Sequence, residues 1–336
     1  MINIFKKTCD LAMNSLIRNF FFVVIVFVFN PFTVSASNGT LVLDPQNPGP
    51  YEGVTITFKT YDFNVDNAKF TWYVDKKVVL SGKGEKSLPI KTKGVGVNTM
   101  VDAKIEVPGG EIVNSAINLS PQAVGLVWES TESYVPPFYE GKALPSEDSA
   151  VRIIAVPSFS SQGAQINASD LSYAWYLNDN FINSGSGRGK STLNTRLDFL
   201  SNENTYKVIV RSDGGSVAEN RITISPNQIS PVFYLKDPIL GLDLAHAIEK
   251  RFETTKEFAL SLVPYFVSSK NGLGSSVNYS WTLDGLLITP NSNTDVTLRP
   301  KDNSYGSKFL SVSIENTKRY LQKAQDDLNV VFDTRQ

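Results

Sequence analysis

The sequence has very few of the side chains that bind metals or crosslink a chain. Its 336 residues include one Cys, Cys9, and one His, His246. A disulfide framework needs several cysteines, and a Cys₂His₂ zinc site needs two of each residue, so the sequence excludes both. It also disfavours a Cys–His catalytic pair. Without disulfides, burial of apolar side chains is the main force available for folding.

The sequence also lacks an excess of charge of either sign. Its 32 Lys and Arg residues nearly balance its 33 Asp and Glu residues. Nucleic-acid binding through bulk positive charge is therefore excluded, and no nucleic-acid partner is predicted. With 41% hydrophobic and 19% charged residues, the composition is typical of a globular chain. A chain of this length is expected to form two or three domains.

Long apolar runs are absent as well. The longest near the amino terminus is 20–29, and a membrane span needs about 20 apolar residues. Lys6 and Lys7 precede this run, and small residues ending at Ala36 follow it. This pattern predicts a secretory signal peptide over 1–36, cleaved after Ala36. The alternative is a retained amino-terminal anchor, which would be the one membrane contact. Either way, we expect an exported protein, located extracellularly, at the cell surface or in the periplasm.

What the chain does contain is an internal repeat. The pattern aromatic-x-Trp-x-aliphatic-Asx occurs around Trp72, Trp175 and Trp281. These tryptophans lie roughly 105 residues apart, which is the length of one small domain. Alternation with period two indicates a β-strand, and the Asx that follows it indicates a turn. The repeat predicts three units after the signal peptide: unit 1 (37–120), unit 2 (121–228) and unit 3 (229–336).

Each unit is predicted to be a β-sandwich. Short alternating runs separated by Gly, Asn and Asp turns are typical of an immunoglobulin-like sandwich with a Trp on its third strand. The three repeated tryptophans are predicted to fill the cores, with sugar stacking as the alternative. The expected fold class is all-β, with three tandem Ig-like sandwiches. In unit 2 the predicted strands are 124–128, 151–156, 171–177, 192–199, 206–210 and 221–224.

The Tyr-x-Trp-x-(Leu/Val)-(Asp/Asn) strand and turn resemble the tandem PKD-like and bacterial Ig-like domains of secreted or surface proteins. The chain has Trp-Tyr-Leu-Asn-Asp-Asn at Trp175, where PKD domains carry Trp-Asp-Phe-Gly-Asp-Gly. The proline-rich segment 135–145 resembles uncharacterised exported proteins of uncultured bacteria. These resemblances imply adhesion, spacing or assembly at a cell surface.

Two insertions precede the second strand of units 2 and 3, at 130–148 and 236–255. In the second of these, Leu244, Ile248 and Phe252 have helical spacing, which predicts a short helix. The first insertion is predicted either to cover a sandwich end or to contact a neighbouring molecule. In the second case Phe138 and Tyr139 are the candidate partner-binding residues, because aromatic side chains dominate interface hot spots. Short proline-containing linkers between the units predict an extended, semi-rigid rod.

Motifs that would indicate chemistry are incomplete. The segment 184–191 resembles a phosphate loop but has Ser184 where the first Gly is required, so no nucleotide is predicted. The segment 62–67 lacks the Gly and Glu of an EF-hand, although a weaker calcium site in that loop stays open. His246 is the only imidazole, and the sequence contains no Gly-x-Ser-x-Gly motif to supply a nucleophilic serine for a Ser-His-Asp hydrolase. We therefore predict no catalytic residue, no metal and no cofactor.

The function predicted from sequence is a non-enzymatic adhesion or scaffold rod, with an unidentified protein or glycan at the cell envelope as partner. One alternative is a carbohydrate- or peptidoglycan-binding module, for which Trp128 or Tyr134 would supply the aromatic platform. A second alternative is a hydrolase, which would need two facing carboxylates in a cleft.

Overall fold

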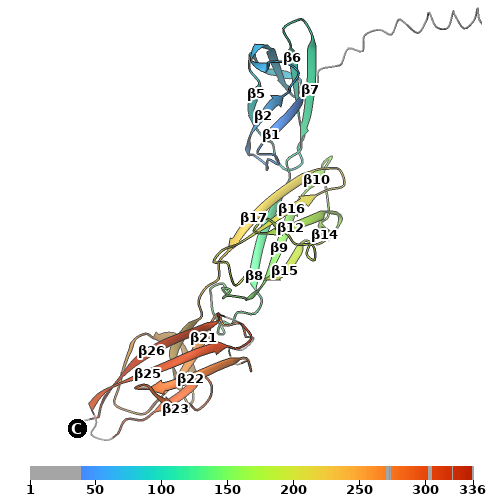
Figure 1. Cartoon of the computed structure of the whole chain (residues 1–336). Coiled ribbons are helices and arrows are strands. Elements are labelled where there is room, and N and C mark those ends of the chain that lie inside the picture. The colour runs from blue at the N-terminus through green and yellow to red at the C-terminus, as the bar shows by residue number, and fades with distance from the viewer. Residues whose placement is uncertain (1–38, 270–271, 273, 302–304, 320, 335–336) are drawn as a thin grey trace, which may run out of the picture.

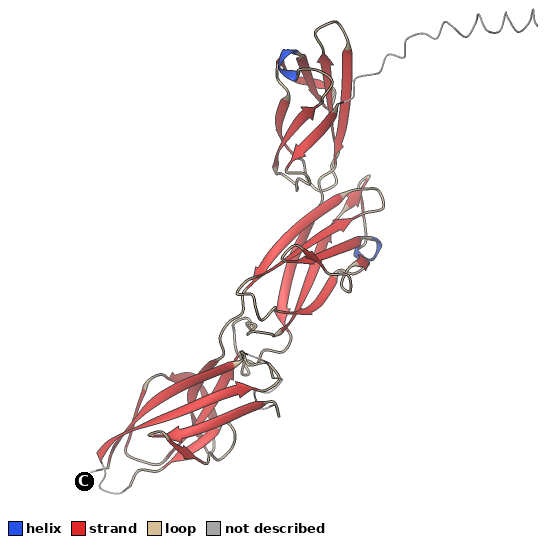
Figure 2. Cartoon of the chain, in the orientation of Figure 1, coloured by secondary structure: helices blue, strands red, loops and turns tan. Residues whose placement is uncertain are grey.

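The computed structural model describes residues 39–269, 272, 274–301, 305–319 and 321–334. The predicted signal peptide, 1–36, lies outside the described residues. Figure 1 shows three units arranged end to end along an extended molecule, and Figure 2 shows that almost every element is a strand. The predicted fold class, all-β with tandem Ig-like sandwiches, is confirmed.

Unit 1 packs a sheet of order β1-β2-β5 against a sheet of order β4-β3-β6-β7. Apolar residues alternate along β2 and β6, and their buried members meet Phe70 and Trp72 in the core. The elements are β1 (Thr40–Asp44), β2 (Gly53–Lys59), a 3-10 turn (Val65–Asn67), β3 (Lys69–Val74), β4 (Lys77–Lys83), β5 (Ser87–Lys91), β6 (Thr99–Glu106) and β7 (Ile112–Leu119).

Unit 2 repeats this plan with sheets of order β15-β9-β8 and β13-β12-β16-β17. Each of the six strands predicted for this unit overlaps an observed strand. The elements are β8 (Ala123–Ser130), β9 (Ala150–Ser158), β10 (Ser160–Ser161), β11 (Ala164–Gln165), a 3-10 turn (Ala168–Asp170), β12 (Ser172–Leu177), β13 (Asn180–Phe181), β14 (Gly187–Arg188), β15 (Thr192–Arg196), β16 (Asn204–Arg211) and β17 (Val217–Ile224).

Unit 3 packs a sheet of order β19-β18-β21-β24 against one of order β20-β26-β25-β22-β23. Within the second sheet, β20 pairs with β26 in parallel. The strands are β18 (Ser230–Asp237), β19 (Gly241–Ile248), β20 (Arg251–Thr254), β21 (Phe258–Tyr265), β22 (Val277–Leu283), β23 (Leu286–Ile288), β24 (Asp295–Leu298), β25 (Tyr305–Asn316) and β26 (Lys323–Asp333).

The short helix predicted from Leu244, Ile248 and Phe252 is wrong, because these residues lie on the two strands β19 and β20. Ile248 and Phe252 both pack on the core of unit 3, from strands that belong to opposite sheets. Their spacing of four residues therefore arises from a change of sheet and not from a helical turn.

The recurring tryptophans occupy equivalent places. Trp72, Trp175 and Trp281 are at most 1% exposed, on β3, β12 and β22. Each indole N–H donates to a backbone carbonyl, that of Glu85 (2.7 Å), Lys190 (3.0 Å) and Asn293 (2.9 Å) respectively. These bonds satisfy the indole's polar group, which would be costly to bury unpaired.

The Asx that ends each repeat motif has a second structural role. Asp75, Asn178 and Asp284 all have positive φ, which suits the two-residue hairpin turn that follows the tryptophan strand. Their side-chain oxygens accept hydrogen bonds from the backbone N–H of Met100, Thr205 and Phe309, at 2.9–3.1 Å. The motif therefore fixes a core residue, a turn and the register of a neighbouring strand at once.

Candidate functional site: the joint between units 2 and 3

The segment 131–149, which we call the strap, joins β8 to β9 and packs against unit 3. Ser133 and Ser268 form an isolated antiparallel bridge. The Tyr134 backbone N–H donates to the Val267 carbonyl (2.9 Å), and its carbonyl accepts from the Phe266 N–H (2.7 Å). The half-buried Tyr134 ring packs on the core of unit 3. Tyr134, predicted as a sugar platform, is therefore part of the joint.

A buried polar network extends this joint. The Gln322 side-chain amide, on unit 3, donates to the Glu147 carbonyl (2.6 Å) and to Ser268 Oγ (2.7 Å). Ser268 Oγ is also 2.8 Å from Ser149 Oγ, and Ser146 Oγ donates to the Phe266 carbonyl at 2.8 Å. Because the three serines and Gln322 are at most 9% exposed, the bonds act away from competing water and hold the two units together.

The carboxylate of Glu132, at the start of the strap, binds one arginine from each side. Arg196 of unit 2 reaches Oε1 at 2.8 Å, and Arg319 of unit 3 reaches Oε2 at 3.0 Å. Partial burial alone would raise the pKa of Glu132, but hydrogen bonds from the two guanidinium groups lower it below its ordinary value of 4.5. Removal of this charge would leave both cations without their shared partner.

Acid is expected to weaken the joint. A carboxyl whose pKa is lower in the folded state stabilises that state above its ordinary pKa, and the contribution is lost as pH falls through the folded value. Because Glu132 is partly solvated, we expect a loss of about 1 kcal/mol below pH 4. Comparison of thermal unfolding at pH 7 and pH 3 tests this. Glu132→Gln should reduce the difference in melting temperature between the two pH values. An unchanged difference would mean that other carboxyl groups cause the loss of stability in acid.

Tyr139 and Phe138, the two candidate partner-binding residues, have opposite surroundings. The half-buried Tyr139 ring packs against the rings of Tyr265 and Phe266 in unit 3, with centroids 5.6 and 6.3 Å away. Phe138 is 97% exposed and has a φ of 62°. Tyr139 thus belongs to the joint, while Phe138 points into solvent from an anchored loop.

Trp128, the other candidate sugar platform, lies on β8 and packs in part against the core of unit 2. The ammonium of Lys142, on the strap, lies 3.2 Å from the centroid of its ring. This contact is a cation–π interaction, and it covers the ring with a charge. The joint thus brings together Tyr134 and Tyr139 and leaves Trp128 and Phe138 outside it.

The residues weighed for other chemistry have ordinary surroundings. His246 lies on β19 with its side chain 82% exposed, and its Nδ1 is 2.9 Å from Asp243 Oδ2. In the calcium candidate, Asp66 pairs with Lys86, and in the phosphate-loop candidate the Lys190 amine donates to the Ser184 carbonyl. Within the described residues, no three His, Cys, Asp or Glu side chains gather as a metal site. No helix in that part of the chain is long and apolar enough to cross a membrane.

Sequence reasoning missed the polar half of the joint. Gln322, Ser268 and Glu132 belong to no motif and lie far apart in the chain. One indirect signal was available, since the insertion that carries the strap was identified by comparison of units. Neither the partner of this insertion nor the polar pairs could be predicted from it.

No family model matches the chain, and no curated protein matches it. The chain does align with solved structures. The fibronectin(III)-like modules of Clostridium thermocellum CbhA align with 56% of this chain and 95% of their own, at 15% identity and a TM-score of 0.27. The three N-terminal domains of the bacteriophage RB49 highly immunogenic outer capsid protein align with 89% and 100%, at 11% identity and 0.25.

A third similar structure is that of a 1.5-MDa bacterial ice-binding adhesin, which aligns with 90% of this chain and 98% of its own at 7% identity and a TM-score of 0.23. The solved structures with which the chain aligns include tandem fibronectin-III and immunoglobulin arrays. At these TM-scores the likenesses carry no argument about activity, partner or a PKD-like family. The assignment of tandem Ig-like sandwiches rests on the strand order of each unit.

Proposed function

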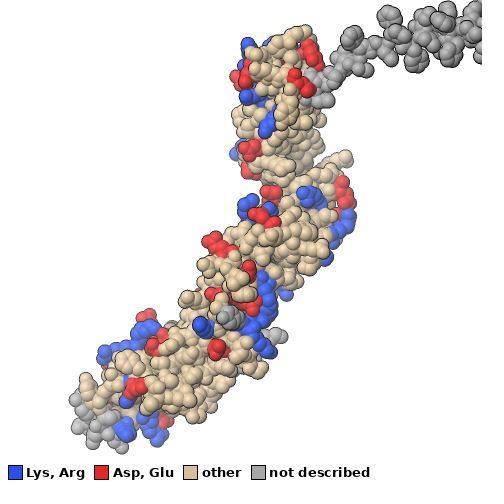
Figure 3. Space-filling model, in the orientation of Figure 1, with Lys and Arg blue, Asp and Glu red and all other residues tan. Residues whose placement is uncertain are grey.

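We propose that this chain is a non-enzymatic, exported spacer that presents the strap of unit 2 to a protein partner at the cell envelope. Export rests on the predicted signal peptide, and the spacer role on the end-to-end units of Figure 1. In the face shown in Figure 3, Lys and Arg are interspersed with Asp and Glu on all three units. A partner would therefore be recognised by a local feature rather than by a field of one sign.

The observation that carries the proposal is the conformation of Phe138. An exposed Phe forfeits about 2 kcal/mol of burial energy, and positive φ costs a non-glycine residue about 1 kcal/mol more. Such outliers persist only where their surroundings hold them, and they gather at functional sites. Here the holding elements are Pro136 and Pro137 on one side and the packed Tyr139 ring on the other. A preorganised aromatic fits an apolar pocket on a partner with little loss of entropy.

The contacts of Trp128 and Tyr134 disfavour these two rings as a platform for stacking a sugar. The Trp128 ring is covered by Lys142, and the Tyr134 ring is packed into the joint. A sugar that stacked on either ring would first have to break these contacts.

Replacement of Phe138 by glycine should make the protein more stable. Glycine adopts positive φ without strain, which recovers about 1–2 kcal/mol, but its greater freedom in the unfolded chain costs about 0.5–1 kcal/mol, so we expect Phe138→Gly to gain roughly 0.5–1 kcal/mol of unfolding free energy. Urea denaturation followed by circular dichroism measures this, with Phe199→Gly at another exposed phenylalanine as control. A loss of stability in Phe138→Gly would mean that the ring supports the fold, and would contradict its role as a presented anchor.

Site-specific crosslinking tests the partner. A photoreactive phenylalanine analogue at position 138, in the cells that make the chain, should link to one protein species. The same analogue at Tyr61, which is fully exposed on unit 1, serves as control. The species should be absent at 61, and it should bind purified chain but not the Phe138→Gly variant. No product at 138, or equal products at both positions, would overturn the proposal.

A further inference from the structure

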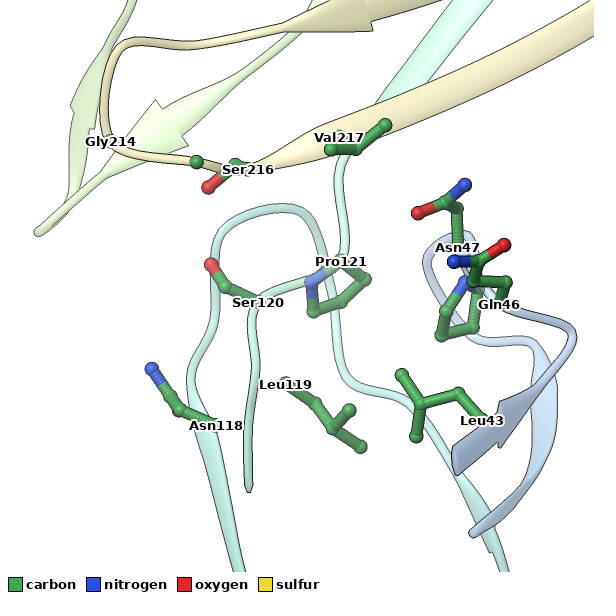
Figure 4. Close-up of a pocket in the computed structure, with 12 residues that line it drawn as sticks. Leu43, Gln46, Asn47, Asn118, Leu119, Ser120, Pro121, Gly214, Ser216 and Val217 are labelled. Carbon is green, nitrogen blue, oxygen red and sulfur yellow. The ribbon is translucent and has the colours of Figure 1, made fainter. Parts of the chain in front are cut away.

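The joint between units 1 and 2 contains a cleft. Three segments meet around Pro121, as Figure 4 shows: 43–48 from the first hairpin of unit 1, 118–121 from the end of β7 and the linker, and 214–217 around the β16–β17 turn of unit 2. They enclose about 290 Å³ and leave one side open to solvent. This volume is close to the lower limit for small-molecule sites, which often form at domain interfaces.

The lining of the cleft is polar but carries no charge. Gln46 and Asn118 are its most exposed amides, and neither side chain has a hydrogen-bond partner among the described residues. Leu119 and Pro121 are buried beneath them, and Val217 is half-buried on the side of unit 2. A charged ligand would lose hydration here without gaining a counter-charge from the lining, and the Glu219 carboxylate beside it already lies 3.4 Å from the Asn47 amide. The cleft therefore suits an uncharged ligand that has both polar groups and an apolar face.

The joint that contains this cleft is held by few bonds. The Gly96 N–H donates to the Pro121 carbonyl at 2.7 Å. Ser160 Oγ donates to the Val95 carbonyl at 3.4 Å, and the Asn47 amide reaches Glu219 at 3.4 Å. Among the described residues, no arginine bridges this joint as Arg319 bridges the other one. A ligand in the cleft would touch both units and so favour one angle between them.

We propose that this cleft binds an uncharged saccharide. A carboxamide both donates and accepts hydrogen bonds, which matches neighbouring sugar hydroxyls, and the Gln46 and Asn118 amides are free to do so. The C–H face of a sugar ring would lie against Val217, the half-buried apolar side chain of the lining, because Leu119 and Pro121 are buried and expose little surface. This site lies at the joint between units 1 and 2, so it goes beyond the proposed function and is separate from the Phe138 loop of the strap.

Calorimetric titration of the full chain tests the proposal with three uncharged trisaccharides: cellotriose, maltotriose and N,N′,N″-triacetylchitotriose. We expect at least one to bind, and we expect Asn118→Ala and Gln46→Ala each to weaken it about 10-fold, the equivalent of one hydrogen bond of about 1.4 kcal/mol. Asn114→Ala is the matched control, because Asn114 is also an exposed asparagine on β7 but lies outside the cleft. This variant should bind as the parent does.

Small-angle scattering supplies a second readout, since saturating sugar should narrow the distribution of molecular lengths in the parent and not in Asn118→Ala. Absence of binding by all three sugars would overturn the proposal, as would an equal loss in Asn114→Ala. Binding of peptides in their place would also overturn it. Phe138→Gly should bind sugar unchanged, so failure here is distinguishable from failure of the proposed partner site.

Discussion

Trp175→Ala should lower the unfolding free energy of unit 2 by about 3–5 kcal/mol, the range for truncation of a large aromatic side chain in a core. The indole is fully buried among strands from both sheets of unit 2, so its removal leaves a cavity that neither sheet can close alone. It also leaves the Lys190 carbonyl without its indole donor. A loss of this size is a large fraction of the stability of a small domain, which is about 5–15 kcal/mol.

Urea denaturation, followed by circular dichroism, measures the effect. Trp175→Phe separates the contribution of the buried ring from that of the indole hydrogen bond, because it keeps much of the ring and loses the N–H. This variant should cost about 1–3 kcal/mol. Trp128→Ala is the matched control on the same unit: this ring is only half-buried, and its loss should cost less than Trp175→Ala. Equal losses at the two positions would contradict the assignment of Trp175 as the centre of the core.

The repeat motif explains why so much of the fold could be predicted. Around Trp175, period-two alternation predicts a strand, and Asn178 predicts its turn, because both depend on local stereochemistry. The same rules failed between Leu244 and Phe252. There, apolar residues serve two sheets in succession, and spacing alone cannot distinguish a change of sheet from a turn of helix.

The candidate site depended on facts that are not local. Phe138 and Tyr139 are adjacent and both aromatic, yet the positions of Tyr265 and Phe266 decide which of them is partly buried. From the sequence, the Trp128 ring was a candidate for stacking a sugar. The ammonium of Lys142 covers it, but Lys142 lies on the strap, whose path could not be predicted. Aromatic type identifies residues capable of binding, and tertiary contacts then determine which of them remain accessible.

Gln322→Ala should separate the unfolding of units 2 and 3. Gln322 is 1% exposed, and its side chain donates to the Glu147 carbonyl and to Ser268 Oγ while it accepts from the Ser268 N–H at 3.1 Å. Truncation leaves these groups buried without a partner, at about 1–3 kcal/mol for each unsatisfied group. We expect a total loss of about 2–4 kcal/mol, concentrated at the joint.

Differential scanning calorimetry of the full chain checks this: the parent should show units 2 and 3 melting together, and the variant should show two transitions. Gln325→Ala, three residues further along the chain on β26 and exposed to solvent, is the control and should melt as the parent does. Scattering should also show a broader range of lengths for Gln322→Ala than for Gln325→Ala. A single unshifted transition in Gln322→Ala would mean that the arginines on Glu132 and the packed tyrosines hold the joint unaided, and that the buried polar network contributes specificity of orientation rather than coupling.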